Sequence, residues 1–252
     1  MGLVDGKVAL VTGAGSGIGR GSAIAFAQEG AKVIVADVVV EGGEETVRMI
    51  KDAGGEAAFI KCDVSKAADV EAMVKFAVDT YGTLDYAHNN AGIEGPMSPT
   101  ADYAEADWDK VISINLKGVW LCMKSEIPVM LAGGGGAIVN TASIAGLVGF
   151  QGLPAYTASK WGVNGVTKAA ALEYAKAGIR VNSVCPGVIQ TAMVERLVEA
   201  TPEMEAGLVA GTPMGILGQP DNIAQAVVWL CSDRASFVTG HNMAVDGGFV
   251  SQ

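Results

Sequence analysis

Short runs of β-branched and other apolar residues alternate with longer amphipathic segments along most of the chain. Each short run has the length of a buried strand, and each longer segment repeats its apolar residues with the period of a helix. Strands that are each followed by a helix form a parallel sheet covered on both faces. The sequence therefore predicts an α/β fold, a three-layer doubly wound parallel sheet, in a single domain over 1–252. The expected strands are Lys7–Val11, Lys32–Ala36, Ala57–Lys61, Leu84–His88, Ala137–Asn140, Arg180–Val184 and Met243–Val245. The expected helices are Ile18–Gln28, Glu41–Asp52, Ala67–Tyr81, Glu105–Leu131, Ala155–Lys176 and Asp221–Cys231.

Charge and hydropathy argue against two classes of partner. The formal net charge is -10, and no local cluster of Lys and Arg offsets it, so we expect no nucleic-acid partner. Half of the residues are hydrophobic, but no apolar run approaches the roughly 20 residues that span a bilayer. The first residues lack the basic and apolar segments of a secretory signal, so we expect a cytoplasmic protein that does not enter membranes.

The cysteines and histidines do not have the spacing of metal ligands. The four cysteines lie far apart, which indicates buried reduced thiols. Neither His88 nor His241 has a suitably spaced Cys or His neighbour, so we expect no metal site. His88 stands in an apolar strand, where we expect a hydrogen-bonded core residue.

A glycine-rich segment, Thr12–Gly19, follows the first expected strand and opens the first expected helix. Glycines in that context allow a tight turn and close approach of the backbone to a pyrophosphate, while the helix N-terminus offers free N–H groups. The strict G-x-G-x-x-G pattern is not met, because Ile18 occupies the place of the third glycine, and a purely structural turn stays an alternative. The predicted coenzyme contacts here are Gly13, Ser16, Gly17, Ile18 and Gly19.

Asp37 follows the second expected strand, where a carboxylate that binds the adenosine ribose is expected. A carboxylate there repels a 2′-phosphate, and neither Ser16 nor Val38 supplies a positive charge that would attract one. We therefore predict NAD as the cofactor rather than NADP. The alternative for Asp37 alone is a solvated turn residue.

Tyr156 precedes Lys160 by four residues within an expected helix, so their side chains share one face. A neighbouring ammonium favours the phenolate, and we expect Lys160 to lower the pKa of Tyr156. The pair has the composition of an acid/base device, although such a spacing also arises by chance.

Several ordered motifs together identify a family. The chain resembles the single-domain short-chain dehydrogenase/reductases, which have a Rossmann fold, and the resemblance extends over essentially the whole chain. The motifs that carry it are Thr12–Gly19, Asp63-Val64, Asn89-Asn90-Ala91-Gly92, Asn115, Ser143, Tyr156 with Lys160, and Pro186-Gly187.

The resemblance implies further contacts with NAD. Asp63 would accept a hydrogen bond from the adenine amino group, and the backbone of Val64 would contact the ring. The segment Asn90, Ala91 and Gly92 would shape the site beside the riboses. The expected contacts at the nicotinamide end are Pro186, Gly187, Ile189 and Thr191. Asp63 and Thr191 taken singly are also common capping residues.

The resemblance also implies the roles of four catalytic residues. Tyr156 would exchange a proton with the substrate oxygen, and Ser143 would hydrogen-bond that oxygen. Lys160 would assist Tyr156 and bind the nicotinamide ribose, while Asn115 would hold a water that links Lys160 to solvent. The expected reaction interconverts a secondary alcohol and a ketone. The residues around Ser143 do not form Gly-x-Ser-x-Gly, which argues against a hydrolase.

The expected substrate is a small, uncharged molecule. A long segment at about 188–218 would cover it, and that segment is rich in methionine and leucine. Such adaptable apolar walls, with Glu94 near the mouth, favour an apolar or alicyclic alcohol or ketone. The expected substrate contacts are Ser143, Ile144, Phe150, Tyr156 and Met193.

Two other functions stay open. One is reduction of 3-ketoacyl groups on a carrier protein, which usually requires NADPH and a basic docking patch. The other is a non-catalytic NAD-binding protein. The family commonly forms helix-paired oligomers, so we expect a homodimer or homotetramer, which sedimentation measures.

Overall fold

Seven parallel strands form one sheet in the order β3-β2-β1-β4-β5-β6-β7. The computed structural model describes residues 2–191 and 203–252. The sequence order of the strands reverses between β1 and β4, as in other doubly wound sheets. This confirms the predicted single-domain α/β fold. The strands are β1 (Val8–Thr12), β2 (Lys32–Asp37), β3 (Glu56–Lys61), β4 (Tyr86–Asn89), β5 (Gly136–Thr141), β6 (Ile179–Pro186) and β7 (Asn242–Val245).

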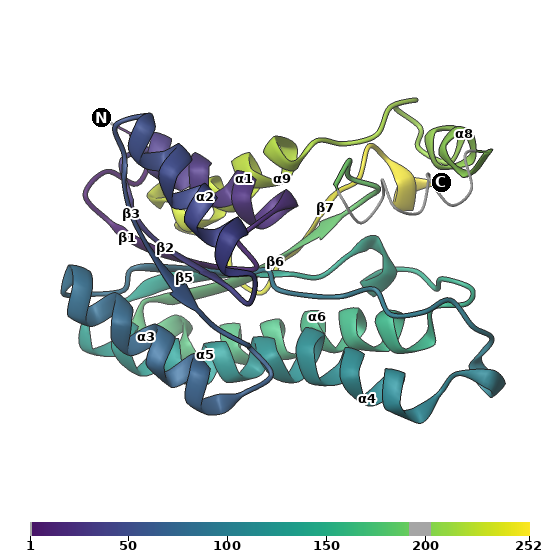
Figure 1. Cartoon of the computed structure of the whole chain (residues 1–252), viewed down its shortest axis with the longest axis horizontal. Helices are drawn as coiled ribbons and strands as arrows, with labels where there is room; N and C mark the ends of the chain where they lie inside the picture. The colour runs from purple at the N-terminus through teal and green to yellow at the C-terminus, as the bar shows by residue number, and fades with distance from the viewer. Residues whose placement is uncertain (1, 192–202) are drawn as a thin grey trace.

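Helices cover both faces of the sheet (Figure 1). One layer contains α1 (Gly17–Gln28), α2 (Val40–Asp52) and α9 (Pro220–Cys231), and the other contains α3 (Ala67–Tyr81), α4 (Glu105–Ile112), α5 (Gly118–Ala132) and α6 (Pro154–Tyr174). Because each face of the sheet is covered, every residue of β1 is buried, which explains why its sequence is a continuous apolar run. The apolar core is correspondingly split into two clusters, one in each layer.

The single helix expected over Glu105–Leu131 is in fact two α-helices, which are joined by a turn that is not α-helical. α4 and α5 are joined by a π-helical turn, Ser113–Lys117, which contains Asn115. A π turn inserts an extra residue into the hydrogen-bonding pattern and often occurs at functional sites. The pattern of hydrophobic residues changes too little at a π turn for the turn to be predicted from sequence. A further helix that the pattern missed, α8 (Glu203–Ala210), lies within the segment 188–218.

All four cysteines are buried and free, as expected.

Some buried polar groups in this fold lack a hydrogen-bond partner. His88 is fully buried and its Nε2 lies 2.8 Å from Thr141 Oγ1, which confirms a core residue. Burial lowers the pKa of His88 to about 3, so the ring is neutral. Its Nδ1 has no hydrogen-bond partner among the described residues.

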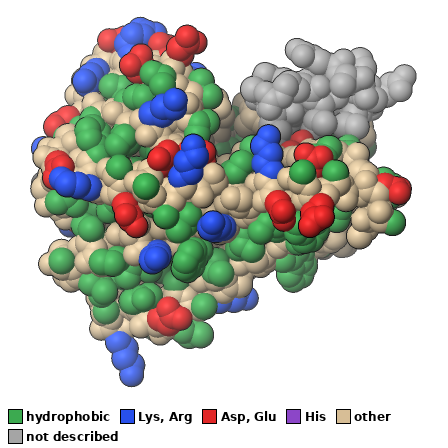
Figure 2. Space-filling view, turned by 60° about the horizontal axis from the view of Figure 1, so that its bottom comes forward, with side chains coloured by type: hydrophobic (Ala, Val, Ile, Leu, Met, Phe, Trp, Pro, Cys, Tyr) green, Lys and Arg blue, Asp and Glu red, His purple; other side chains and the backbone are tan. Residues whose placement is uncertain are grey.

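The surface carries charges of both signs and several exposed aromatic side chains. Figure 2, in which the α5 and α6 side of the molecule comes forward, shows acidic, basic and hydrophobic side chains interspersed. Trp108, Trp120 and Trp161 on α4, α5 and α6 are 38%, 46% and 52% exposed. No helix in the described part of the chain has the length and hydropathy to span a bilayer. The oligomeric state stays a prediction.

Glu126 on α5 is a fully buried carboxyl group that accepts a hydrogen bond from Asn89 Nδ2 at 3.0 Å. Burial raises its pKa from 4.5 to about 8, although the bond from Asn89 opposes the rise. The unfolded chain loses this proton near pH 4.5 and the folded chain near pH 8. Unfolding therefore releases a proton between these values, and the stability contributed here falls as the pH rises.

We predict that Glu126→Gln removes this dependence, because glutamine keeps an acceptor for Asn89 and carries no charge. At pH 8 the variant should be more stable than the wild type by roughly 1–4 kcal/mol, and the difference should vanish toward pH 5. Melting temperatures between pH 5 and pH 8 measure this, with Glu173→Gln on the exposed face of α6 as the control. A constant difference across that range would show that Glu126 is ionised in the folded chain.

Candidate active site

A cavity of about 560 Å³ lies at the carboxyl ends of the central strands, across the point where the strand order reverses. This is where parallel doubly wound sheets bind ligands. Most of the residues predicted from sequence line it together: Gly13, Ser16, Gly17, Ile18, Asp37, Asp63, Val64, Asn90, Ala91, Gly92, Ser143, Ile144, Phe150, Tyr156, Lys160, Pro186, Gly187, Ile189 and Thr191. Gly19 and Asn115 lie behind the lining. Met193 is outside the described residues.

The glycine-rich turn is shaped by steric limits that only glycine meets. Gly13 and Gly17 have φ angles of 63° and 51°, in the left-handed region. A Cβ on Gly19 would lie 2.1 Å from the carbonyl oxygen of Gly13. Ser16 forms no side-chain capping bond to α1, and the first N–H groups of a helix have no intrahelical partner. The turn therefore has a shape and free N–H groups that suit a phosphate group, and its role in coenzyme binding stays a prediction.

Asn90 connects this turn to the end of β4. The hydroxyl of Thr12 accepts hydrogen bonds from the backbone N–H groups of Asn90 at 2.9 Å and of Ala91 at 3.1 Å. In return, Asn90 Nδ2 donates to the carbonyl oxygen of Thr12 at 3.1 Å. The sequence marked Thr12 as part of the motif but did not indicate this contact, which depends on strands distant in sequence.

Asp37 lies at the end of β2, beside the turn. Its Oδ2 accepts the N–H of Gly15 at 2.8 Å and its Oδ1 accepts the N–H of Val39 at 2.8 Å. The carboxylate thus faces the cavity while it is held by two backbone donors. Each carboxylate oxygen keeps capacity for a second donor such as a ribose hydroxyl.

Asp63 both lines the cavity and forms a local turn. Its Oδ1 accepts bonds from the N–H of Ser65 at 3.1 Å and from its hydroxyl at 2.7 Å. Lys66 Nζ lies 3.3 Å from Asp63 Oδ2. The Ser65 hydroxyl, above all, lowers the pKa of Asp63, so the side chain is a carboxylate at neutral pH. Asp63 therefore acts as a local capping residue, the alternative noted from the sequence, and it also lines the cavity.

The far side of the cavity follows β6. A Cβ on Gly187 would lie 2.7 Å from Cα of Asp246, so this turn requires glycine. Ile189 pairs with Gly218 in an isolated bridge. A Cβ on Gly17 would lie 3.2 Å from Thr191 Cγ2, which places Thr191 directly across from the glycine-rich turn.

Asn115 holds the loop after β4. Its Oδ1 accepts the N–H of Ile93 at 2.8 Å, and its Nδ2 donates to the carbonyl oxygen of Ile93 at 2.8 Å. Nδ2 also lies 3.2 Å from Ser159 Oγ. The amide therefore clamps a loop that lines the cavity to α6. Its expected role in holding a water is not tested by these contacts.

Ser143, Tyr156 and Lys160 lie together on the wall formed by β5 and α6. Lys160 is 3% exposed and its Nζ donates to the carbonyl oxygen of Thr141 at 2.8 Å. The same Nζ lies 5.5 Å from the centroid of the Tyr156 ring. The Ser143 side chain lies close enough to Tyr156 to favour the ionised form of its phenol.

The expected lowering of the Tyr156 pKa by Lys160 is not found in the polypeptide alone. Burial raises the pKa of Tyr156 to about 12, with a further rise from Glu94, and the nearby Ser143 side chain opposes the rise. Burial also lowers the pKa of Lys160 to about 8, so part of its charge is lost near that pH. The spacing showed that the two side chains share a face, but it did not show that Lys160 is buried and Tyr156 half-buried.

Apolar side chains surround the outer end of the cavity. Ile144, Phe150, Leu153 and Leu208 line it. The ring of Phe150 stacks on Phe249, with centroids 6.0 Å apart and an interplanar angle of 20°. The sequence did not point to Phe249, because it comes from the C-terminal end of the chain. A second cavity of about 570 Å³ adjoins this end.

Comparisons with known proteins agree with this geometry. A family model described as Enoyl-(Acyl carrier protein) reductase matches residues 13–250. Cyclohexanol dehydrogenase of Acinetobacter sp. (strain SE19) is 49% identical over 248 residues, which are 98% of this chain and 96% of that protein. The crystal structure of levodione reductase matches with a TM-score of 0.95 and 38% identity, covering 98% of each chain. A crystal structure from Agrobacterium tumefaciens with bound NADP matches with a TM-score of 0.91 and 34% identity, covering 99% of this chain and 98% of that one.

The similarity extends over nearly the full length of the chain and of its relatives. It confirms the family and the fold class expected from sequence, as well as the oxidoreductase class. The chain belongs to the short-chain dehydrogenase/reductase family and is an alcohol and ketone oxidoreductase that uses a nicotinamide cofactor.

Proposed function

We propose that this protein is an NAD(H)-dependent dehydrogenase that interconverts an uncharged, apolar or alicyclic secondary alcohol and its ketone. The observation that carries the proposal is the wall of the cavity where Ser143, Tyr156 and Lys160 meet apolar side chains. Polar groups able to move a proton thus face a region suited to an apolar carbon skeleton.

Tyr156 is the proposed general acid and base. During oxidation its phenolate accepts the proton of the substrate hydroxyl, and during reduction its phenol donates that proton to the carbonyl oxygen. Ser143 holds the same oxygen through a hydrogen bond and stabilises the charge that develops there. The chemistry that a bound nicotinamide coenzyme supplies is hydride acceptance or donation at the substrate carbon, and its oxidised ring brings a positive charge that favours the phenolate.

Lys160 has two proposed tasks, which its position supports. It brings a cation to within 5.5 Å of the Tyr156 ring, and it lines the cavity beside Gly92, where the ribose hydroxyls of a bound coenzyme would lie. Asn115 orients the loop around Ile93, beside Gly92 and near Lys160 Nζ. We assign it a positioning role, with the water relay as an additional hypothesis.

The coenzyme contacts follow the two ends of the cavity. The turn at Gly13 to Gly19 would bind the pyrophosphate, Asp37 the adenosine ribose, and Asp63 with Val64 the adenine. The segments at Asn90 to Gly92 and at Pro186 to Thr191 would enclose the nicotinamide and its ribose. Asp37 favours NAD, because a 2′-phosphate placed beside it would meet a carboxylate.

Two considerations support an alicyclic substrate. The outer part of the cavity is lined by Ile144, Phe150, Leu153 and Leu208, while Glu94 adds a negative charge that disfavours anions. Two of the relatives are named for alicyclic compounds, cyclohexanol and levodione. We also propose that the whole chain is one catalytic domain in which the segment 188–218, including Met193, covers the substrate.

The alternatives are supported less well. The description of the matching family model, Enoyl-(Acyl carrier protein) reductase, refers to an enzyme that reduces carrier-bound substrates. However, the net charge of -10 is unfavourable for docking an acidic carrier protein. A non-catalytic NAD-binding protein has no use for Ser143, Tyr156 and Lys160 on one wall of the cavity.

We predict that NADH forms when the protein is given NAD and cyclohexanol or a related alicyclic secondary alcohol. Absorbance at 340 nm over a panel of alcohols, sugars and hydroxy acids measures the preference. Alicyclic alcohols should have the highest kcat/KM. A strong preference for a sugar or for a charged acid would contradict the apolar substrate class.

We predict that Tyr156→Phe folds and binds NADH but loses on the order of a hundredfold or more in kcat, the usual value of a positioned acid/base group. The substitution removes only the hydroxyl, so the melting temperature and the NADH dissociation constant should change little. Turnover close to that of the wild type would remove Tyr156 from the mechanism.

We predict that Asp37→Ser raises the dissociation constant of NADH about tenfold and reduces the discrimination against NADPH. The serine cannot offer two charged acceptors to the ribose, and it no longer repels a 2′-phosphate. Fluorescence titrations with both reduced coenzymes measure this. A wild-type protein that already binds NADPH more tightly would contradict the choice of NAD.

A further inference from the structure

The outer side of the glycine-rich turn is held by hydrogen bonds to every backbone polar group of Ala14 and Gly15. The N–H of Ala14 donates to the carbonyl oxygen of Ala36 at 3.1 Å, and the N–H of Gly15 donates to Asp37. The carbonyl oxygen of Ala14 accepts the hydroxyl of Thr46 at 2.8 Å. The carbonyl oxygen of Gly15 accepts a bond from Arg20 Nη2.

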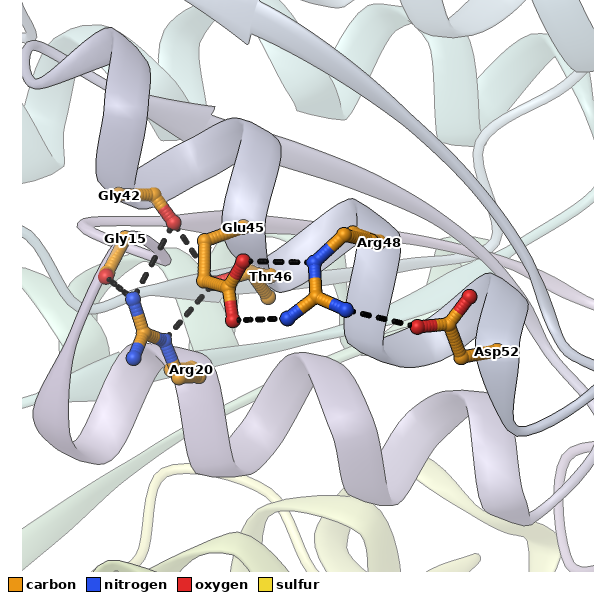
Figure 3. A network of polar contacts seen from close by, with 7 residues as sticks. All are labelled: Gly15, Arg20, Gly42, Glu45, Thr46, Arg48 and Asp52. Carbon is orange, nitrogen blue, oxygen red and sulfur yellow. Dashed lines mark hydrogen bonds and ion pairs between the residues drawn. The ribbon is translucent and has the colours of Figure 1, made fainter.

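Arg20 connects three segments at this point (Figure 3). It belongs to α1, and its Nε donates to Thr46 Oγ1 at 3.0 Å. Its Nη2 also donates to the carbonyl oxygen of Gly42 at 3.3 Å, in the first turn of α2. Thr46 is fully buried beneath the guanidinium. The turn, the start of α1 and the start of α2 are therefore fixed to one another.

α2 packs directly against the turn, with no room for a side chain between the two. A Cβ on Gly42 would lie 2.9 Å from the carbonyl oxygen of Gly15. A Cβ on Gly15 would lie 2.8 Å from Asp37 Oδ2. Any shift of α2 away from this contact would break the bonds of Arg20 and Thr46 first, since these are the side chains that span it.

Arg48 on the same helix provides a contrast (Figure 3). It pairs with Glu45 at 2.7 Å and with Asp52 at 2.9 Å, and its side chain is 62% exposed. Exposed ion pairs of this kind contribute little to stability. In the described ranges, Arg20 forms no ion pair, and its three partners are neutral oxygens. Arg48, and to a smaller extent the charge of Arg20, lower the pKa of Glu45, so the guanidinium of Arg20 faces α2 on the outer side of the turn.

We propose that Arg20 and Thr46 are positioning residues for the coenzyme. They hold the peptide groups of Ala14 and Gly15 from outside, so that the free N–H groups at the start of α1 stay directed at the pyrophosphate. Coenzyme binding therefore depends on where α2 lies, because α2 holds the turn through these contacts. The proposal rests on the binding of a nicotinamide coenzyme at this turn, and it adds residues that do not line the cavity themselves.

Two pairs of substitutions test it by fluorescence titration with NADH. Thr46→Val keeps the shape but loses the hydroxyl, and should raise the dissociation constant about tenfold, while Thr46→Ser should stay within about twofold of the wild type. Arg20→Met should also raise it about tenfold or more, and the matched control Arg48→Met should leave it unchanged. At saturating coenzyme, kcat and the KM for alcohol should be close to wild type.

Wild-type dissociation constants in both Arg20→Met and Thr46→Val would overturn the proposal. So would an equal loss in Thr46→Ser and Thr46→Val that follows their melting temperatures, because that is the result of a merely structural role. The titrations are repeated with NADPH. A wild-type preference for NADPH would contradict the proposed NAD dependence, while the comparison among variants would still decide the roles of Arg20 and Thr46.

Discussion

At the end of β1 the backbone of the glycine-rich turn packs so closely on its surroundings that Gly13 and Gly19 have no room for a side chain. A Cβ on Gly13 would lie 2.9 Å from Cα of Ala91, and one on Gly19 would lie 2.1 Å from the carbonyl oxygen of Gly13. The hydrogen bonds between Thr12 and Asn90 keep the ends of β1 and β4 together. The contact between Gly13 and Ala91 holds the glycine-rich turn against the end of β4, at one wall of the cavity in which a coenzyme would lie.

Hydrogen-bonded side chains, rather than glycines, position the reacting side of the cavity. The amide of Asn115 holds both polar groups of the Ile93 backbone, and the carbonyl oxygen of Thr141 holds the ammonium of Lys160. The bond of Lys160 is buried and the two bonds of Asn115 are partly buried, so an unpaired polar group there would be costly. Burial also raises the pKa of Tyr156. The protein alone thus keeps its phenol protonated, and on the proposed mechanism the bound coenzyme lowers the cost of ionising it.

The sequence was sufficient for the strands, most of the helices and most of the cavity lining, because each motif follows a strand and parallel strands end at one edge. It was not sufficient for features that depend on packing between distant segments. The π turn around Asn115 and the stacking of Phe249 on Phe150 belong to this class. So do the bonds of Arg20 to α2. The pKa of Tyr156 in the polypeptide alone is raised, not lowered as expected, for the same reason, since burial depends on the complete fold.

The central claim is that the substrate carbon loses hydride to a nicotinamide coenzyme while Tyr156 takes the hydroxyl proton. Oxidation of a secondary alcohol deuterated at its carbinol carbon tests whether the hydrogen on that carbon goes to the coenzyme and not to Tyr156. The reduced coenzyme is analysed by mass spectrometry. The account predicts one deuterium in the coenzyme for each ketone formed. Ketone formation with the deuterium released to water would contradict it.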